Sequence, residues 1–130
     1  MKDAKILLVD DEVVFANNMS KLLNRRGYQV TAVNGGDTAL RSLMENPFDV
    51  MVLDLKMPGM DGIAVLHEMK KLGLVTEVLV LTGHGSIDTA LEAIQLGAYD
   101  YLTKPCEIAE LVSKIEAALE KKATAQKKGD

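Results

Sequence analysis

The stretch Val50–Asp54 reads VMVLD, four apolar residues that end on a carboxylate. An unbroken β-branched and Leu-rich run of this length is typical of a strand buried on both faces of a parallel sheet. Similar runs occupy residues 6–9 and 78–81, and two more lie at residues 28–33 and 99–102. The run at 28–33 alternates polar and apolar residues, which predicts an edge strand.

Apolar residues recur at helical spacing in the segments between and after these runs. Phe15, Met19, Leu22 and Leu23 share one helical face, and Gly27 then predicts a helix end. Comparable faces lie at residues 39–44, 63–70, 87–94 and 108–119. Strands that alternate with helices indicate an α/β fold, a doubly wound five-stranded parallel sheet flanked by five helices with right-handed crossovers.

Composition sets limits on the classes of function. A chain of 130 residues with 48% apolar and 4% aromatic content predicts one domain with an aliphatic core. The net charge of −4 excludes a basic field that could hold nucleic acid. A single Cys and a charged start followed by four apolar residues predict a cytoplasmic protein without a signal peptide or membrane span. We expect the domain to occupy residues 1–122 and residues 123–130 to form a polar, disordered tail.

Polar residues follow four of the five runs. The first run leads to Asp10-Asp11-Glu12, the third to Asp54, the fourth to Thr82, and the fifth to Thr103-Lys104. Singly, each has an ordinary structural explanation, such as a helix N-cap at Asp11 or Glu12, a loop cap at Thr82 or a solvated Lys104. The carboxyl ends of parallel strands lie at one sheet edge, where ligands bind, so together these residues predict one site.

Charge indicates what such a site would hold. Asp10, Asp11 and Asp54 contribute −3, which one Mg²⁺ and Lys104 would neutralise. A cation and a lysine are the usual clamp on phosphoryl oxygens. Asp54 can act as a carboxylate nucleophile that forms an aspartyl phosphate, and the Thr82 hydroxyl can donate to the added group.

At these residues the chain resembles a response-regulator receiver domain of two-component signal transduction. The resemblance covers residues 5 to about 122. Its motifs are LLVDD at 7–11, DLKMPGMDG at 54–62, LTG at 81–83 and GAYDYLTKP at 97–105. It implies the flavodoxin-like, chemotaxis-regulator-like fold with strand order 2-1-3-4-5. Residues 83–86 and 97–102 further resemble receivers attached to enhancer-binding transcription activators, and some hybrid kinases.

The resemblance also implies roles for individual residues. Asp54 would be the phospho-acceptor, and the metal would be Mg²⁺, with Mn²⁺ as a substitute. Asp11 would ligate the metal directly and Asp10 mainly through water. The backbone carbonyl of Lys56 would be a third protein ligand.

Three further roles follow from the same family. Thr82 and Lys104 would hold phosphoryl oxygens, and Tyr101 would turn inward as Thr82 moves toward the phosphate. The Lys104–Pro105 peptide bond would be cis. Apart from the resemblance, Lys56 and His84 each lie two places after a site residue, where they would modulate phosphoryl lifetime. We hypothesise that Lys56 pairs with the phosphoryl group and obstructs water, and a solvent-facing Lys56 is an equal alternative. His84 could titrate beside the site, but an ordinary exposed loop histidine is favoured over that reading.

The family implies partners as well. The donor would be a phosphohistidine on a sensor histidine kinase or a histidine phosphotransfer protein. Phosphorylation would switch the face made by the fourth helix, fifth strand and fifth helix toward a downstream protein or an attached effector domain. A phosphorylation-dependent homodimer is open, as is excision from a longer regulator. We expect no direct nucleic-acid or membrane binding and no turnover of an external substrate.

Three other functions share parts of this pattern. A haloacid-dehalogenase-like phosphohydrolase would need a second Asp two places after the nucleophile, where this chain has Lys56. A flavodoxin-like nucleotide binder would need phosphate-cradling Ser, Thr or Gly where residues 10–12 are acidic. A phosphorylation-independent docking module would not need the complete set of site residues.

Overall fold

The computed structural model describes residues 3–83 and 87–129, in which five strands alternate with five helices. The alternation follows the sequence pattern, since each apolar run forms a strand and each segment with helical spacing forms a helix. The elements, in chain order, are β1 (Lys5–Val9), α1 (Val13–Arg25), β2 (Gln29–Val33), α2 (Gly36–Glu45), β3 (Val50–Asp54), α3 (Gly62–Leu72), β4 (Glu77–Thr82), α4 (Ile87–Gln95), β5 (Asp100–Thr103) and α5 (Ile108–Gly129).

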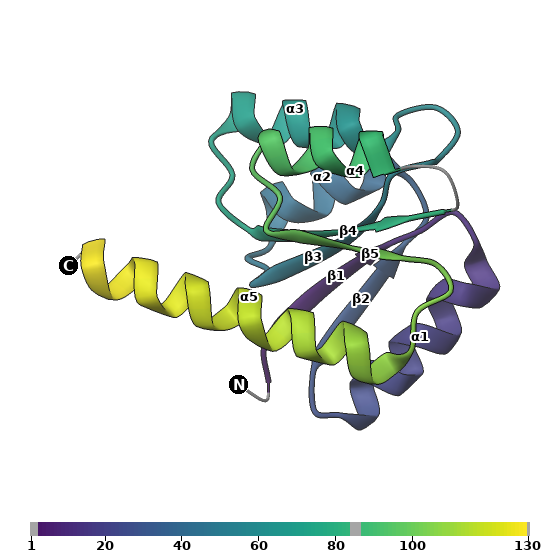
Figure 1. Ribbon diagram of the computed structural model, residues 1–130, viewed down its shortest axis with the longest axis horizontal. Helices are drawn as coiled ribbons and strands as arrows, with labels where there is room; N and C mark the ends of the chain where they lie inside the picture. Colours follow the sequence, from purple (N-terminus) through teal and green to yellow (C-terminus); the bar gives the residue numbers. More distant parts are fainter. Residues whose placement is uncertain (1–2, 84–86, 130) are drawn as a thin grey trace.

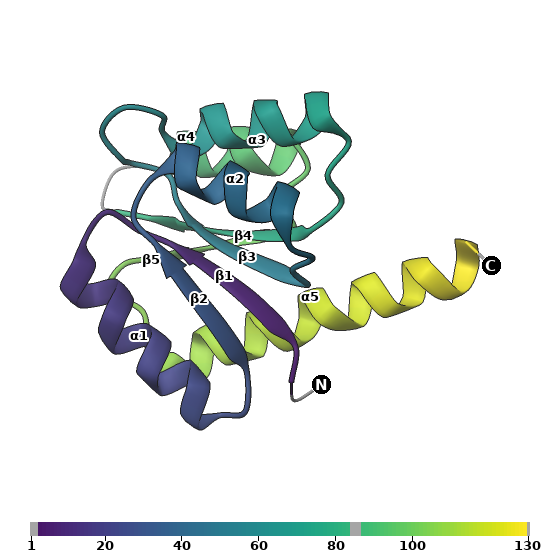
Figure 2. The ribbon, with the colours of Figure 1, turned by 180° about the vertical axis from the view of Figure 1, so that it is seen from behind.

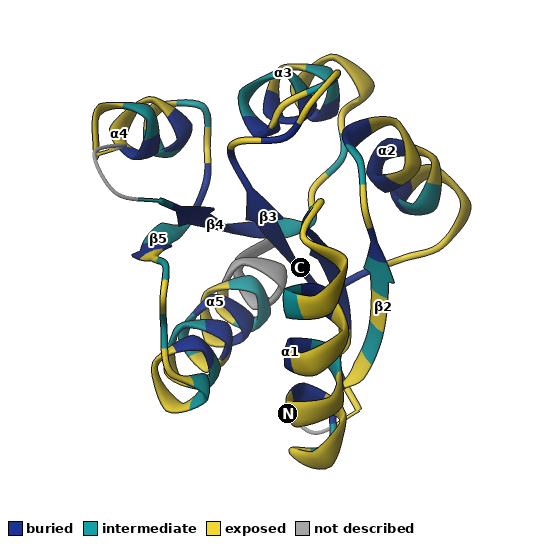
Figure 3. Ribbon diagram, turned by 90° about the vertical axis from the view of Figure 1, so that its right-hand side faces the viewer, coloured by how far each residue is buried: buried dark blue, intermediate teal, exposed yellow. Residues whose placement is uncertain are grey.

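The strands form one parallel sheet in the order β2-β1-β3-β4-β5, which confirms the predicted topology. Helices α2, α3 and α4 cover one face of the sheet, and α1 and α5 cover the other (Figures 1 and 2). β2 lies at one edge, where its residues are partly exposed, as its alternating sequence predicts. β3 is central and buried along its whole length (Figure 3).

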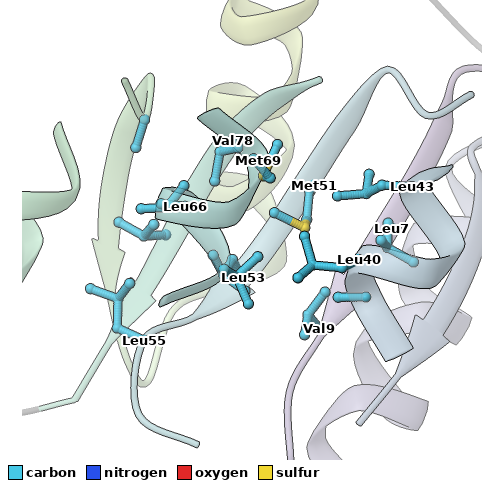
Figure 4. Close-up of a cluster of buried hydrophobic side chains, with 14 of the residues drawn as sticks. Leu7, Val9, Leu40, Leu43, Met51, Leu53, Leu55, Leu66, Met69 and Val78 are labelled. Carbon is cyan, nitrogen blue, oxygen red and sulfur yellow. The ribbon is translucent and has the colours of Figure 1, made fainter. Parts of the chain in front are cut away.

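Two apolar clusters hold the helices on the sheet. Successive strand residues point to opposite faces, so Met51 and Leu53 join the cluster under α2, α3 and α4, while Val50 and Val52 join the cluster under α1 and α5. Figure 4 shows the first cluster, with Leu40 packed near Met51. Because both faces of the central strands are covered, those strands need continuous apolar runs.

Local signals set the ends of α3. The side chain of Asp61 accepts a hydrogen bond from the backbone N–H of Ala64 at 2.9 Å and so caps the first turn. Gly73 ends the helix at φ 68°, a left-handed conformation that favours glycine. The cap lies seven residues after Asp54 and the helix begins at the next residue, Gly62, so a short loop joins β3 to α3 at the carboxyl edge of the sheet.

The structure differs from the predicted polar tail at residues 123–130, since α5 continues past residue 122 to Gly129. The segment after residue 119 is rich in Lys, Glu, Ala and Gln, which have high helix propensity, and contains no Gly or Pro before Gly129. A polar composition is compatible with both a disordered tail and a solvated helix. Within residues 3–83 and 87–129, no helix has the length and apolarity required to cross a membrane.

Candidate functional site

The polar residues after the strands meet at one edge of the sheet. Asp54 ends β3, Thr82 ends β4, and Asp10 and Lys104 directly follow β1 and β5. Thr82 pairs in register with Thr103, and the backbone N–H of Lys104 donates to the Thr82 carbonyl at 2.7 Å. The parallel arrangement therefore gathers residues that are up to 94 positions apart, from 10 to 104, as the sequence predicts.

Lys104 is the cation of this cluster. Its Nζ lies 2.7 Å from Asp10 Oδ2, 2.8 Å from Glu12 Oε1 and 3.6 Å from Asp54 Oδ2. The ammonium also lies 4.6 Å from the centre of the Phe15 ring. Burial acts to lower the pKa of Lys104, but its close contacts with Asp10 and Glu12, together with the negative charge of Asp54, outweigh burial and raise that pKa. Lys104 is therefore charged throughout the physiological range of pH.

The carboxylates are fixed by backbone groups. Asp10 is fully buried, and its Oδ1 accepts from the backbone N–H of Glu12 at 2.9 Å. Asp54 is 5% exposed, and its Oδ1 accepts from the backbone N–H of Lys56 at 3.2 Å. Oxygens of Asp10, Glu12 and Asp54 lie within 4.8 Å of one another. Three such oxygens match the ligands that a hard divalent cation prefers.

The environment of Asp54 disfavours its charged form. Burial, followed by the negative charge of Asp10, raises the pKa of Asp54 from 3.8 to about 6, and Lys104 opposes the rise. A carboxylate with a pKa near 6 is still mostly ionised at neutral pH. Asp54 is thus a buried, mostly ionised carboxylate whose negative charge Lys104 offsets only in part, and groups with such perturbed pKa values cluster at functional sites.

Thr82 supplies a hydroxyl at the same edge. The residue is 1% exposed, and its Oγ1 has no hydrogen-bond partner in the part of the chain that the structure describes. A buried hydroxyl without a partner loses the hydrogen bonds that water would have provided. An acceptor placed beside Asp54 would restore one of them.

Other predicted residues lie around this centre. Asp11 is exposed and is absent from the trio of close oxygens, although its side chain reaches Asp54 and helps to raise that residue's pKa. Lys56 has an exposed side chain. Tyr101 is half-buried and packs against the apolar cluster under α2, α3 and α4. His84 lies outside the described residues.

Two more observations complete the site. The peptide bond between Lys104 and Pro105 is cis. Sequence reasoning missed the contact between Glu12 and Lys104, and treated Glu12 only as a neighbour of the aspartates or a helix cap. The only signal was the third acidic residue of the run at 10–12, and nothing in the local pattern relates it to a lysine 92 positions away.

The sequence model of the response regulator receiver domain family matches residues 6–116. This chain belongs to that family. Receiver domains are regulatory modules of two-component systems, in which an aspartate is phosphorylated and Mg²⁺ binds at an acidic pocket. The fold and the cluster of Asp10, Glu12 and Asp54 agree with that assignment.

Similar proteins include several transcriptional regulators. The chain is 41% identical over 114 residues to the transcriptional regulatory protein ZraR of Escherichia coli (strain K12), covering 88% of this chain and 26% of ZraR. It is 36% identical over 122 residues to the transcriptional regulatory protein FixJ of Bradyrhizobium diazoefficiens, covering 94% of this chain and 60% of FixJ. The receiver chain therefore spans only about a quarter of ZraR.

Solved structures show the same fold. A response regulator receiver domain protein from Clostridium thermocellum has a TM-score of 0.89 and 37% identity, covering 94% of this chain and 98% of that chain. NtrX from Brucella abortus has a TM-score of 0.92 and 33% identity, covering 98% of this chain and 29% of NtrX. The receiver is thus seen both as a separate domain and within a longer protein.

Proposed function

We propose that this receiver accepts a phosphoryl group on Asp54 from a phosphohistidine, in a reaction that depends on Mg²⁺. The donor is a sensor histidine kinase or a histidine phosphotransfer protein in the cytoplasm. One observation carries the proposal. A buried carboxylate at the end of the central strand lies 3.6 Å from a lysine ammonium and within 4.8 Å of two further carboxylate oxygens.

The residues present fit a magnesium ion. Asp10, Glu12 and Asp54 bring three carboxylate oxygens together against one lysine, and a divalent cation would offset their remaining repulsion. We assign Asp10, Asp11 and Asp54, with the backbone carbonyl of Lys56, as the groups that hold the ion, and Mn²⁺ as its substitute. The bound ion would supply positive charge that stabilises the transferring phosphoryl oxygens.

The chemical step is a transfer between two nucleophiles. An Asp54 carboxylate oxygen forms a bond to phosphorus as the bond from phosphorus to the donor imidazole nitrogen breaks, and the electron pair remains on that nitrogen. The protein contributes position and charge, because the transferred group itself needs little covalent assistance. Lys104 and the Thr82 hydroxyl hold the phosphoryl oxygens after transfer.

The phosphorylated state then changes a surface. Thr82 gains an acceptor for its buried hydroxyl, and Tyr101 turns inward as Thr82 moves, which alters the face made by α4, β5 and α5. That face acts on a downstream protein or an attached effector domain, or forms a homodimer. The domain itself binds neither nucleic acid nor membrane, and it turns over no external substrate.

Incubation with acetyl phosphate, followed by intact-mass measurement, tests the proposal. We expect one added phosphoryl group that requires Mg²⁺ and is absent from Asp54→Asn. Circular dichroism of Asp54→Asn shows whether the loss reflects chemistry rather than unfolding. If folded protein with Mg²⁺ gains no adduct from acetyl phosphate or from a phosphohistidine donor, the proposal is overturned in favour of a docking module. Sustained release of inorganic phosphate from an external phosphate ester would instead support a phosphohydrolase.

A further inference from the structure

The contact between Glu12 and Lys104 adds a feature that phosphoryl transfer does not require. The Lys104 ammonium donates a hydrogen bond to Glu12 Oε1 at 2.8 Å and forms an ion pair with Asp10 Oδ2 at 2.7 Å. Asp54, the proposed acceptor, is the most distant of the three carboxylates, at 3.6 Å. Lys104 therefore lies closer to two carboxylates that do not react, Asp10 and Glu12, than to the proposed acceptor Asp54.

The two anchors of Lys104 differ in how readily they can release it. Asp10 is fully buried, and the backbone of Glu12 fixes its other oxygen at 2.9 Å. The side chain of Glu12 is 64% exposed, so its carboxylate can turn into water and regain hydration when the contact breaks.

Glu12 also changes the charge of the site. The four carboxylates of Asp10, Asp11, Glu12 and Asp54 carry four negative charges when ionised, against one on Lys104 and two on a divalent cation. A phosphoryl group adds further negative charge to the same space. Glu12 and the phosphoryl oxygens therefore compete for one ammonium.

We propose that Glu12 is a positioning residue that holds Lys104 away from Asp54 in the unphosphorylated state and must release it when the phosphoryl group arrives. This inference rests on the proposed function and deepens it. Release from Glu12 is part of the activation barrier, so a receiver without this carboxylate should be phosphorylated faster. The opposite role, a ligand that recruits the metal, would make the same substitution slow the reaction.

The test compares Glu12→Gln with Glu107→Gln in the full chain. Glu107 is an exposed carboxylate three residues after Lys104 that is not among its ion-pair partners, so its removal controls for the loss of one negative charge. With acetyl phosphate and saturating Mg²⁺, we expect Glu12→Gln to accept the phosphoryl group about two- to fivefold faster than Glu107→Gln, the range of an exposed ion pair.

A second background identifies the residue through which Glu12 acts. In Lys104→Met, whatever its own rate, adding Glu12→Gln should change the rate no more than adding Glu107→Gln does. The Mg²⁺ concentration that gives half the maximal rate should be the same in the two Gln variants. Equal rates in the two variants, acceleration that persists without Lys104, or a raised Mg²⁺ requirement in Glu12→Gln would each overturn the inference.

The outcomes also separate this inference from the proposed function. If the unchanged protein accepts a phosphoryl group while Glu12→Gln behaves like Glu107→Gln, only the role of Glu12 is overturned. If the unchanged protein never accepts one, both proposals are overturned. The stability cycle of Glu12→Gln, Lys104→Met and their combination should still show the two side chains to be coupled, since the contact exists before any reaction.

Discussion

At the residue scale, the site combines groups that are destabilising singly and useful together. Asp54 is buried beside Asp10 with only partial compensation from Lys104, so its pKa rises to about 6. Thr82 keeps a buried hydroxyl without a partner in the described part of the chain. Both features raise the free energy of the folded protein, and an added phosphoryl group and a bound cation would lower it again.

We predict that Asp54→Asn stabilises the metal-free protein at about pH 7. The pKa of Asp54 is 3.8 when exposed and about 6 in the fold, so ionisation favours the unfolded chain above about pH 4, and the effect is complete above about pH 6. A shift of about two units corresponds to roughly 2–3 kcal/mol. Urea unfolding with a chelator present measures the difference. It should vanish below about pH 4, and an Asp54→Asn protein less stable than the parent at about pH 7 would contradict the prediction.

A second residue-scale prediction concerns Lys56. Its exposed side chain follows the proposed acceptor by two positions, where it can pair with the phosphoryl group and obstruct water. We expect Lys56→Ala to lose the phosphoryl group about two- to fivefold faster, as the loss of one exposed ionic contact allows. Decay of the adduct, followed by intact mass, measures the rate. Lys70→Ala, an exposed lysine on α3, is the control, and equal decay in the two variants would show that Lys56 points into solvent.

At the element scale, the junction between β3 and α3 positions the proposed acceptor. α3 begins at Gly62, directly after its Asp61 cap. A Cβ at Gly62 would lie 2.7 Å from Leu55 Cα and 2.8 Å from the Asp54 carbonyl oxygen, both of them backbone atoms. The first turn of α3 therefore rests against the chain that follows the acceptor, and only glycine permits this approach.

We predict that Gly62→Ala destabilises the fold by about 1–3 kcal/mol, the range for an overpacked position that forces the backbone to shift. The same shift should slow phosphorylation of Asp54, because the backbone carbonyl oxygen of Asp54 is one of the contacted atoms. Thermal unfolding and the acetyl phosphate reaction measure the two effects. Gly35→Ala is the matched control, since a Cβ there has open space and its φ of −160° suits any residue. Equal stability of the two variants would contradict the close approach of Gly62 to the backbone of Asp54 and Leu55.

At the scale of the whole molecule, the sheet brings together loops that are distant in sequence. The free energy of unfolding should therefore depend on whether the negative charge that these loops share is neutralised. The proposed metal ligands follow β1 and β3, so a cation bound to them links these two strands, and it lies beside Thr82 and Lys104 at the ends of β4 and β5. An ion that binds only the folded protein shifts the unfolding equilibrium by mass action. The metal should therefore affect the entire transition rather than one loop.

We predict that Mg²⁺ at about one hundred times its dissociation constant raises the unfolding free energy by about 2.7 kcal/mol. The gain should be smaller in Asp54→Asn, which removes one charged ligand. Chemical denaturation with Mg²⁺, compared with NaCl at equal ionic strength, measures the gain. Equal stabilisation by the two salts would indicate general screening and would contradict a magnesium site.

The amino-acid sequence by itself determined the order of elements, the central and edge strands, and the sheet edge that gathers Asp10, Asp54, Thr82 and Lys104. These features follow from local periodicity and from the residue at each strand end, which are visible within short windows. Short windows do not determine the extent of α5, because polar residues of high helix propensity are compatible with both a tail and a helix.

Only the tertiary structure determined which charged and polar groups lie close enough to interact. The Glu12–Lys104 contact, the unpartnered Thr82 hydroxyl and the raised pKa of Asp54 depend on burial and on distances of a few ångströms. The two partners of the first contact are 92 residues apart, and no periodic pattern encodes the position of a side-chain atom across that separation. Electrostatic energies change steeply over such distances, so they are determined by the folded structure and cannot be derived from the order of residues alone.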